Sequence, residues 1–463
     1  MEKKHYELIV IGSGPAGQKG AIAAAKLGKS VAIIDRQGML GGVSLHAGTI
    51  PSKTLREAVL YLTGFRQRSF YGQDYVVKDN ISKADLGFRI QTVVERETNV
   101  INQQLRRNGI AVLSGTAHFR NPHTLEVVQN GDSRLIEADN VLIACGTRAA
   151  RNPEIPFDGK RIVTCDELRD VQALPRDFII VGAGVIGLEY ASMCAALNIR
   201  VTLVEQRPTI LDFVDEEIVE GLQFHLRGLG MTFRLGEKVT RVQKDNGTRV
   251  LAELESGKRI HADGLLYAVG RQANTDLLNV EAAGLTADPR GKIKVNEHFQ
   301  TDVPHIYAAG DVVGFPALAA TSMEQGRRAV CTMFGRPATA APQLLPFGIY
   351  TIPEISMVGR TERELTSAKI PYEVGVANYA EMAKGLMVGD QTGLLKILFH
   401  LESHQVLGVH AMGENATEII HIAQAVMAHD GKIEYFRDAV FNYPTFAEAY
   451  KVAALNGLNK LEA

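Results

Sequence analysis

A glycine-rich turn between an apolar strand and a helix occurs twice in this chain, with the same spacing to a following acid. The pattern is Gly-x-Gly-x-x-Gly, and the acid follows the first glycine by 23 residues in both copies. One such turn alone is a weak signal, but two copies in matching context predict two dinucleotide-binding folds. The copies are Gly12-Ser13-Gly14-Pro15-Ala16-Gly17 with Asp35, and Gly182-Ala183-Gly184-Val185-Ile186-Gly187 with Glu205.

Each residue of this pattern has a physical task. The first glycine permits a tight turn, and the second lets the backbone approach a pyrophosphate that the helix N-terminus attracts. The third glycine lets the helix pack closely on the strand, and the acid accepts hydrogen bonds from a ribose. Two such sites in one chain are typical of proteins that pass a hydride from one cofactor to another.

Length, net charge, apolar runs and cysteine spacing limit the kinds of protein that this chain can be. A length of 463 residues predicts about three domains. The net charge of -2 gives no reason to expect nucleic acid or an anionic membrane as a partner. No leader precedes the first strand and no apolar run is long enough to span a bilayer, so we expect a soluble, cytoplasmic protein. The four cysteines lack Cys-x-x-Cys spacing, which argues against a disulfide framework or a metal site.

Hydrophobic periodicity predicts the elements of three units. In the first unit we expect helices at 16–27, within 48–65 and at 85–108, and strands at 30–34 and 140–144. In the second we expect helices at 187–197 and 215–228, strands at 201–204 and 264–270, and hairpins within 238–260. A strand at 305–309 is expected to return to the first unit, and strands at 394–399 and 405–412 precede helices at 417–429 and 445–458.

Further motifs resemble one family over nearly the whole chain, the two-dinucleotide-fold flavoprotein disulfide reductases, which include dihydrolipoamide dehydrogenase, glutathione reductase and mercuric reductase. The motifs are Gly41-Gly42 before Ile50-Pro51-Ser52-Lys53, Ala144-Cys145-Gly146-Thr147, Gly270-Arg271 with Asn274-Thr275, and Ala309-Gly310-Asp311. The resemblance implies an α/β fold in which the first site holds FAD and the second holds NAD(H) or NADP(H). It also implies a homodimer in which each active site borrows residues from the partner.

The resemblance sets the expected domains. Residues 1–150 form the first part of the FAD-binding domain, and 151–273 form the NAD(P)-binding domain. Residues 274–346 complete the FAD-binding domain, and 347–463 form an α+β dimerisation domain.

Two departures from the family pattern concern its redox chemistry. The positions of the family's Cys-x-x-x-x-Cys pair hold Ser44 and Thr49, and a hydroxyl cannot form a disulfide or a thiolate. The family's C-terminal His-Pro-Thr motif reads Tyr443-Pro444-Thr445 here, whereas its partner acid is kept as Glu448. Without a thiol, no imidazole is needed to take its proton. Both departures therefore indicate a site without dithiol chemistry.

One branch of the family lacks a complete redox pair and carries Tyr before this Pro, the soluble pyridine nucleotide transhydrogenases. The chain resembles this branch at 442–450, at 452–459 and at 347–355.

The resemblance also implies roles for single residues. Lys53 is expected beside the flavin N5, paired with Glu189, where a cation would stabilise reduced flavin. Asp311 is expected on the ribityl chain, with a helix starting near Ala317 aimed at the flavin N1–O2 edge. Tyr443 and Glu448 are expected on the far side of the flavin of the partner subunit. The remaining cofactor-binding candidates are Gly12, Gly14, Gly17, Asp35, Arg36, Gly42, Ser44, Thr49, Ala117, Gly146 and Ala319 for FAD, and Gly182, Gly184, Ile186, Gly187, Glu205, Arg207 and Gly270 for the nicotinamide nucleotide.

Several of these residues also have a purely structural explanation. Lys53 has the sequence context of a surface lysine at a helix start, and Asp311 that of a turn aspartate after a strand. Tyr443 can simply fill the space of a missing imidazole. Cys145 is expected to pack, and the histidines near the motifs to be structural.

The expected reaction is hydride transfer from a reduced nicotinamide to the flavin and back to a second, oxidised nicotinamide. The leading hypothesis is a ping-pong transhydrogenase acting between NADPH and NAD⁺. Glu205 favours the free 2′-hydroxyl of NAD(H), whereas Arg207 can attract the 2′-phosphate of NADP(H). Two alternatives remain open, an NADH-dependent diaphorase or quinone reductase, and a flavin-binding sensor without turnover.

Overall fold

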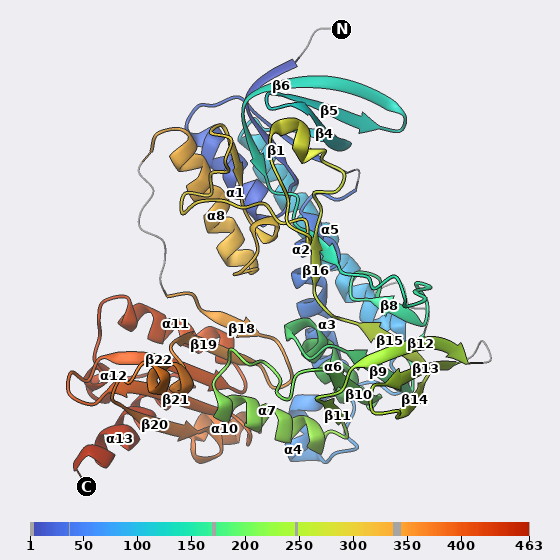
Figure 1. Cartoon of the computed structure of the whole chain (residues 1–463). Coiled ribbons are helices and arrows are strands. Elements are labelled where there is room, and N and C mark those ends of the chain that lie inside the picture. Colours follow the sequence, from blue (N-terminus) through green and yellow to red (C-terminus); the bar gives the residue numbers. More distant parts are fainter. Residues whose placement is uncertain (1–3, 37, 169–172, 246–248, 337–343, 463) are drawn as a thin grey trace.

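The computed structural model describes residues 4–36, 38–168, 173–245, 249–336 and 344–462, which form three units, each built on its own sheet (Figure 1). The sheet of the first unit has the order β3-β2-β1-β6-β5-β4, and β17 also pairs with β6. Leu8, Ile9 and Val10 in β1 are fully buried, as expected for a central strand covered on both faces. The strands are β1 (Lys4–Ile11), β2 (Val31–Asp35), β3 (Ala111–Ser114), β4 (Thr116–Asn121), β5 (Thr124–Gln129), β6 (Asp132–Ile143) and β17 (Ile306–Ala308).

Two helices of the first unit, α1 and α8, pack together unusually closely. A Cβ on Gly326 would lie 2.1 Å from the carbonyl oxygen of Ala16, so only glycine permits this approach. The contact brings the N-terminus of α8 beside the first glycine loop. The helices of this unit are α1 (Pro15–Lys26), α2 (Gly42–His46), α3 (Thr49–Leu62), η1 (Phe65–Gln67), α4 (Arg68–Tyr71), α5 (Lys83–Arg107), η3 (Val280–Ala283), η4 (Asp311–Val313) and α8 (Ala319–Met333).

The second unit repeats the dinucleotide topology. Its sheet, β11-β10-β9-β15-β8, is parallel throughout. A three-stranded antiparallel sheet, β12-β13-β14, confirms the hairpins predicted within 238–260. The elements are β8 (Ile162–Thr164), β9 (Asp177–Val181), α6 (Val185–Ala196), β10 (Arg200–Glu205), α7 (Glu216–Gly228), β11 (Thr232–Leu235), β12 (Val239–Asp245), β13 (Arg249–Leu254), β14 (Arg259–Ala262) and β15 (Gly264–Tyr267).

The chain crosses between the first two units on a short antiparallel ribbon. Strand β7 (Thr147–Ala149) leaves the first unit, and β16 (Arg271–Ala273) returns to it, with Arg271 opposite Ala149. Downstream, β17 pairs with β6, which confirms the predicted return of this segment to the first sheet.

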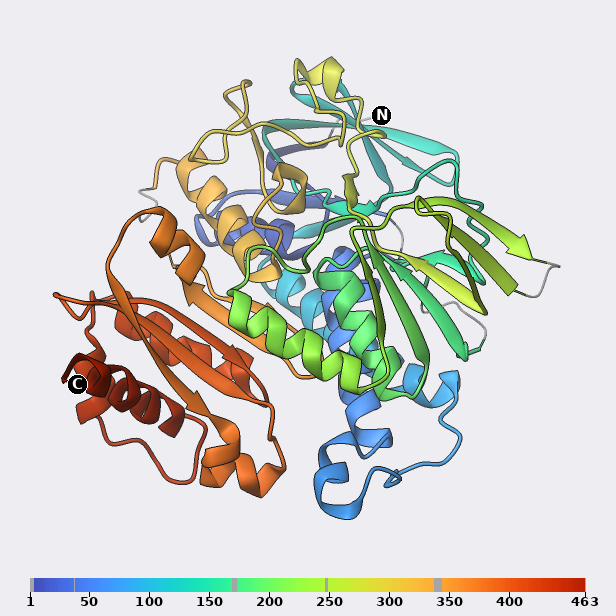
Figure 2. The same ribbon diagram turned by 60° about the horizontal axis from the view of Figure 1, so that its bottom comes forward.

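The C-terminal unit is an antiparallel sheet, β18-β19-β22-β21-β20, covered by helices. Figure 2 shows this unit, in orange and red, beside the green helix α7 of the second unit. The elements are β18 (Phe347–Ile349), β19 (Ile355–Gly359), α9 (Glu362–Ser367), β20 (Tyr372–Asn378), η5 (Tyr379–Glu381), α10 (Ala383–Val388), β21 (Leu394–His400), β22 (Val406–Met412), α11 (Ala416–Met427), α12 (Ile433–Asp438) and α13 (Glu448–Glu462).

The predicted α/β class is confirmed, with two Rossmann-like units and a C-terminal α+β unit. Two boundaries needed correction. The strand expected over 264–270 ends at Tyr267, because the chain turns at Gly270 with a φ of +83°. The helix expected from 445 begins at Glu448, after a turn that contains Pro444. No helix within the described ranges is long and apolar enough to cross a bilayer.

Candidate active site

The first glycine loop has space for a ligand at one position only. A Cβ on Gly12 would lie 2.3 Å from the Ala144 carbonyl oxygen, and one on Gly17 would lie 1.9 Å from the Gly12 carbonyl oxygen. A Cβ on Gly14 would meet no atom within 4 Å. Gly12 and Gly17 are therefore needed for the turn and for packing, whereas Gly14 leaves open space at the start of α1, where a phosphate group fits.

The second loop repeats this geometry. A Cβ on Gly182 would lie 2.7 Å from the Ala268 carbonyl oxygen, one on Gly187 would lie 2.0 Å from the Gly182 carbonyl oxygen, and one on Gly184 would meet no atom within 4 Å. The two acids also match, since Asp35 accepts a hydrogen bond from the Ser13 N–H at 2.6 Å and Glu205 accepts one from the Ala183 N–H at 2.8 Å. The repeated motif therefore folds into two equivalent nucleotide cradles.

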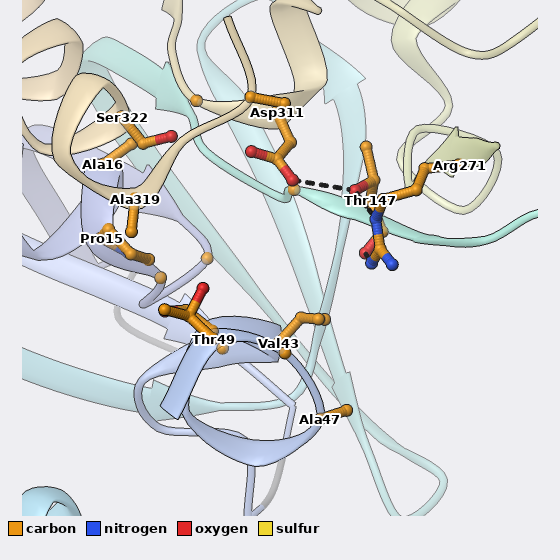
Figure 3. A pocket seen from close by; sticks show the side chains of 18 of the residues that line it. Pro15, Ala16, Val43, Ala47, Thr49, Thr147, Arg271, Asp311, Ala319 and Ser322 are labelled. Atoms are coloured by element: carbon orange, nitrogen blue, oxygen red, sulfur yellow. Dashed lines mark hydrogen bonds between the residues drawn. The ribbon is translucent and has the colours of Figure 1, made fainter. Parts of the chain in front are cut away.

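A cavity of about 840 Å³ runs from the first loop towards the second and third units. Figure 3 shows part of its lining, including Pro15, Thr49, Asp311 and Ala319. Many predicted site residues line it, namely Gly12, Gly14, Asp35, Arg36, Gly42, Ser44, Thr49, Lys53, Ala117, Gly146, Ile186, Glu189, Asp311 and Ala319.

Other predicted residues lie outside this lining as far as the described residues extend. Gly17 is packed beneath the first loop. The rest belong to the second unit or to the C-terminal unit: Gly182, Gly184, Gly187, Glu205, Arg207, Gly270, Tyr443 and Glu448.

Lys53 and Glu189, which both line the cavity, form an ion pair. The Lys53 ammonium donates to both oxygens of Glu189, at 2.8 and 2.7 Å, and Glu189 is only 4% exposed. The ammonium also lies 4.9 Å from the centre of the Tyr350 ring, and the Tyr350 N–H donates to Glu189 at 2.9 Å. Helices α3 and α6 and the segment after β18 thus fix one positive charge in the cavity.

Sequence reasoning missed Tyr350 because it singled out the segment 347–355 only as a resemblance. It also missed the cavity-lining residues Thr417 and His421 of α11. No local motif marks His421, which lies on a helix and lines the cavity.

Ser44 and Thr49 line the cavity from α2 and from the start of α3. Two cysteines, Cys145 and Cys165, also line it. Burial raises the pKa of each of these thiols to about 12. Both are therefore protonated at neutral pH, and a neutral thiol is a poor nucleophile.

The N-terminus of α8 also faces the cavity. Ala317, Leu318, Ala319 and Ala320 line it, and no side chain caps the first turn of this helix. The unsatisfied N–H groups and the positive end of the helix dipole favour an electronegative group there.

The predicted ribose-binding acid of the second unit is paired with the arginine that follows it. Glu205 is 6% exposed, and Arg207 donates to it through its backbone N–H at 3.0 Å and through Nε at 3.1 Å. Burial would raise the pKa of Glu205, but the hydrogen bonds from Arg207 outweigh it, so this pKa lies below its usual value. Arg207 also donates to Asp212 at 3.2 Å.

Tyr443 and Glu448 lie in the C-terminal unit, away from the cavity of their own chain. Tyr443 is 67% exposed. Glu448 has one buried carboxylate oxygen, Oε2, without a hydrogen-bond partner in the described chain. An exposed aromatic ring and an unsatisfied buried acid are compatible with contacts to a second subunit.

These residues fit FAD and a nicotinamide nucleotide. The open Gly14 and Gly184 suit two pyrophosphates, Asp35 and Glu205 suit two riboses, and the start of α8 suits an electronegative ring edge. The fit rests on the glycine geometry, which a Cβ at either open position would fill.

Known protein families match almost the whole chain. Residues 6–326 match the family described as pyridine nucleotide-disulphide oxidoreductase, and residues 345–454 match its dimerisation domain. The soluble pyridine nucleotide transhydrogenase of Mycobacterium tuberculosis is 54% identical over 462 residues, covering 99% of this chain and 98% of the relative. The protein of the same name from Vibrio cholerae is 44% identical over 472 residues, covering 99% of each chain.

Solved structures share the fold over the full length. LpdA from Mycobacterium tuberculosis has a TM-score of 0.89 at 25% identity, covering 98% of this chain and 99% of that one. The HOCl-induced flavoprotein disulfide reductase RclA from Escherichia coli has a TM-score of 0.87 at 27% identity, covering 97% and 99%. The match to the dimerisation domain supports a homodimer.

Proposed function

Because this chain belongs to the pyridine nucleotide-disulphide oxidoreductase family, we propose that it is an FAD-dependent transhydrogenase that moves hydride between NADPH and NAD⁺. The observation that carries the proposal is a cavity lined by a half-buried Lys53–Glu189 pair but with Ser44 and Thr49 at the places of the family's thiols. The similarity to curated transhydrogenases along the full length supports it.

FAD, when bound, supplies the chemistry of accepting and returning hydride. The chain supplies the cradle: Gly14 admits the pyrophosphate, Asp35 binds the adenosine ribose, and Asp311 binds the ribityl chain. The first turn of α8 offers N–H groups to the flavin edge that becomes electron-rich.

The Lys53 ammonium provides fixed charge at the reacting end of the cavity. Glu189 holds it with two hydrogen bonds and Tyr350 lies against it, so the charge is already in place before a nucleotide arrives. Such preorganised charge costs no rearrangement at the moment of hydride transfer.

The hydroxyls of Ser44 and Thr49 cannot accept an electron pair from the flavin site. Without a thiol at these positions, the electrons would have to pass to a small-molecule acceptor, and in the proposed transhydrogenase this acceptor is a second nicotinamide in the same pocket. This requirement leads to a ping-pong cycle in which one nucleotide leaves before the next one binds.

The pairing of Glu205 with Arg207 supports the use of both nucleotides. Paired in this way, Glu205 presents less net negative charge to a 2′-phosphate, and Arg207 can turn to bind that phosphate. NAD(H) has no 2′-phosphate, so its ribose needs only the Glu205 carboxylate. We expect NADH to react faster than NADPH, with both measurable.

The proposal includes the division into 1–150, 151–273, 274–346 and 347–463, and a site completed by Tyr443 and Glu448 of the second subunit. The exposed Tyr443 and the unsatisfied Glu448 support the shared site. Cell fractionation tests the cytoplasmic location that the sequence predicts.

The deciding experiment is a half-reaction series. The yellow holoprotein is reduced anaerobically with NADPH, freed of nucleotide, and mixed separately with NAD⁺, a benzoquinone and oxygen. Rapid reoxidation of the flavin by NAD⁺, with NADH as product, supports the transhydrogenase. Fast reoxidation by quinone with an inert NAD⁺ favours the diaphorase, and a flavin that no nicotinamide reduces favours the sensor.

A further inference from the structure

Both chain crossings between the two dinucleotide units lie side by side at the cavity wall. In the ribbon of β7 and β16, Ala273 pairs with Thr147 and Arg271 pairs with Ala149. Thr147 and Arg271 both line the cavity. Any side-chain contact within this ribbon therefore links the wall of the cavity to the junction of the two units.

Arg271 bonds to both units from this position. Its Nε donates to the Thr147 hydroxyl at 2.7 Å, and its Nη2 donates to the Thr147 carbonyl oxygen at 2.9 Å. Its Nη1 donates to Asp166, which follows β8 of the second unit, at 3.4 Å. The same Asp166 accepts the Ala149 N–H at 2.7 Å. The guanidinium, 21% exposed, is held in one orientation by these contacts.

The proton of the Thr147 hydroxyl has a fixed direction. Because an arginine Nε can only donate, the Thr147 oxygen accepts from Arg271. Its single proton is then donated to Asp311 Oδ2, at 3.1 Å, which makes a directed chain from Arg271 through Thr147 to Asp311 (Figure 3). Within the described residues no hydrogen bond to Asp311 Oδ1 is found, which leaves this oxygen available to the cavity.

We propose that Arg271 is a positioning residue for FAD, acting through Thr147 to hold the Asp311 carboxylate towards the ribityl hydroxyls. The inference rests on the proposed function, in which Asp311 binds the ribityl chain. Since Asp166 holds the other side of the guanidinium, the same contact fixes the flavin-binding carboxylate relative to the nucleotide unit.

The test measures FAD affinity on apoprotein, by the quenching of flavin fluorescence on binding. Thr147→Val removes the hydroxyl and keeps the shape of the side chain. We expect FAD to bind about tenfold more weakly, which corresponds to the loss of one hydrogen bond to a charged group. Thr147→Ser keeps the hydroxyl and should bind FAD like the unmodified protein. Arg271→Met should weaken FAD at least as much as Thr147→Val, and Arg271→Lys should restore part of the loss.

The hydrogen-bond chain from Arg271 through Thr147 to Asp311 is called the relay below. A double-mutant cycle distinguishes an effect of this relay from a general loss of folding. If Thr147 acts through Asp311, Thr147→Val has no further effect on FAD affinity in an Asp311→Ala background. Equal losses in both backgrounds, or unchanged affinity in Thr147→Val alone, overturn the relay. Unchanged affinity in Asp311→Ala alone overturns the proposed place of FAD, and the relay with it. Thermal unfolding of each apoprotein shows whether a variant is folded, and Thr147→Val keeps the test decisive if Arg271→Met does not fold.

Discussion

Ser44 and Thr49, which line the proposed flavin site, should determine how many electrons each subunit can hold. We predict that an anaerobic dithionite titration takes up two electrons per bound FAD, because the hydroxyls next to the flavin site cannot store more. The thiols of Cys145 and Cys165, whose pKa values are raised to about 12, should give no thiolate-to-flavin absorption band at neutral pH. Absorbance recorded during the titration gives both answers. An uptake of four electrons, or a long-wavelength charge-transfer band, contradicts this prediction.

Glu205, Arg207 and Asp212 form the residue group that should set nucleotide preference. Glu205→Ala removes a negative charge from the proposed ribose site, and a repulsion of roughly 1–2 kcal/mol corresponds to about tenfold in the ratio of NADPH to NADH efficiency. Arg207→Ala should weaken NADPH more than NADH. Asp212 is 52% exposed and binds the same guanidinium, so Asp212→Asn should free Arg207 and improve NADPH severalfold.

Stopped-flow reduction of the flavin by each nucleotide measures these ratios. Asp302→Asn, at an exposed aspartate of the first unit, serves as the control for loss of one surface charge. Unchanged ratios in all three variants would mean that the second nucleotide is not bound at Glu205.

Residues within a short motif were predictable from sequence, and residues that meet across the fold were not. The glycine loops and their acids follow from spacing alone, and the pairing of Lys53 with Glu189 followed only from the family resemblance. Tyr350 and the bonds from Arg271 to Thr147 depend on chain segments far apart in sequence. No local pattern of residue types encodes such contacts.

At the scale of elements, a buried lysine joins the second unit to the C-terminal unit. Lys396 in β21 is fully buried and donates to Asp215, at the start of α7, at 2.8 Å. Glu217 and Glu362 also contact its ammonium. The carboxylates of α7 and α9 thus converge on one cation, which fixes the two units against each other.

We predict that Lys396→Met lowers the thermal midpoint of unfolding. It leaves Asp215 buried without its partner, and breaking such a pair costs about 3–5 kcal/mol. Lys432→Met, at an exposed position of the same unit, should have little effect. Differential scanning calorimetry of both variants measures the difference.

The pH dependence of this pair has a definite sign. Burial would raise the pKa of Asp215, but the nearby His410 and Lys396 outweigh it, so this pKa lies below the usual aspartate value. The stabilising contribution is therefore complete above the usual aspartate range and is lost as pH falls through the lowered pKa. The gap in midpoint between Lys396→Met and the unmodified protein should shrink in acid, and a constant gap would contradict the assignment to Asp215.

Long periodic elements were predicted well, and short ones were missed. Helix α5 was expected over 85–108 and is observed at Lys83–Arg107, where Ser82 and Asp85 form a capping box. Strands β18, β19 and β20 of the C-terminal sheet were not predicted. Strand β18 is too short to show a period, β19 is almost continuously buried, and β20 lacks a clear alternation of buried and exposed residues.

At the scale of the whole molecule, the sequence predicted which units exist but not how the site joins them. The duplicated loop and the return of β17 followed from the chain itself. An ion pair joins α3 to α6, and the Tyr350 ring lies against its ammonium. These contacts form only when all three units pack together, so the sequence alone does not show them. Packing of this kind depends on many distant contacts together.

The homodimer leads to the last prediction, which concerns a site shared between subunits. Tyr443 is 67% exposed, nearby Val440 is 95% exposed, and Glu448 has an unsatisfied buried oxygen, so this segment is suited to contact a second copy of the chain. We expect removal of the residues from 347 onward to give an inactive monomer, with its mass measured by light scattering. Because truncation also removes Tyr350 and Lys396, point variants give the sharper test.

Lys53→Met and the double variant Tyr443→Ala/Glu448→Ala should each be poorly active as pure dimers. If the site takes Lys53 from one subunit and the other two residues from its partner, a mixed dimer contains one intact site and one doubly damaged site. Random exchange of equal amounts should then restore about a quarter of full transhydrogenase activity, since half of the dimers are mixed and half of their sites are intact. If each site lies within one subunit, every site in a mixed dimer carries a lesion and no activity returns. Full activity in the pure Tyr443→Ala/Glu448→Ala dimer would also rule out completion of the site by these residues.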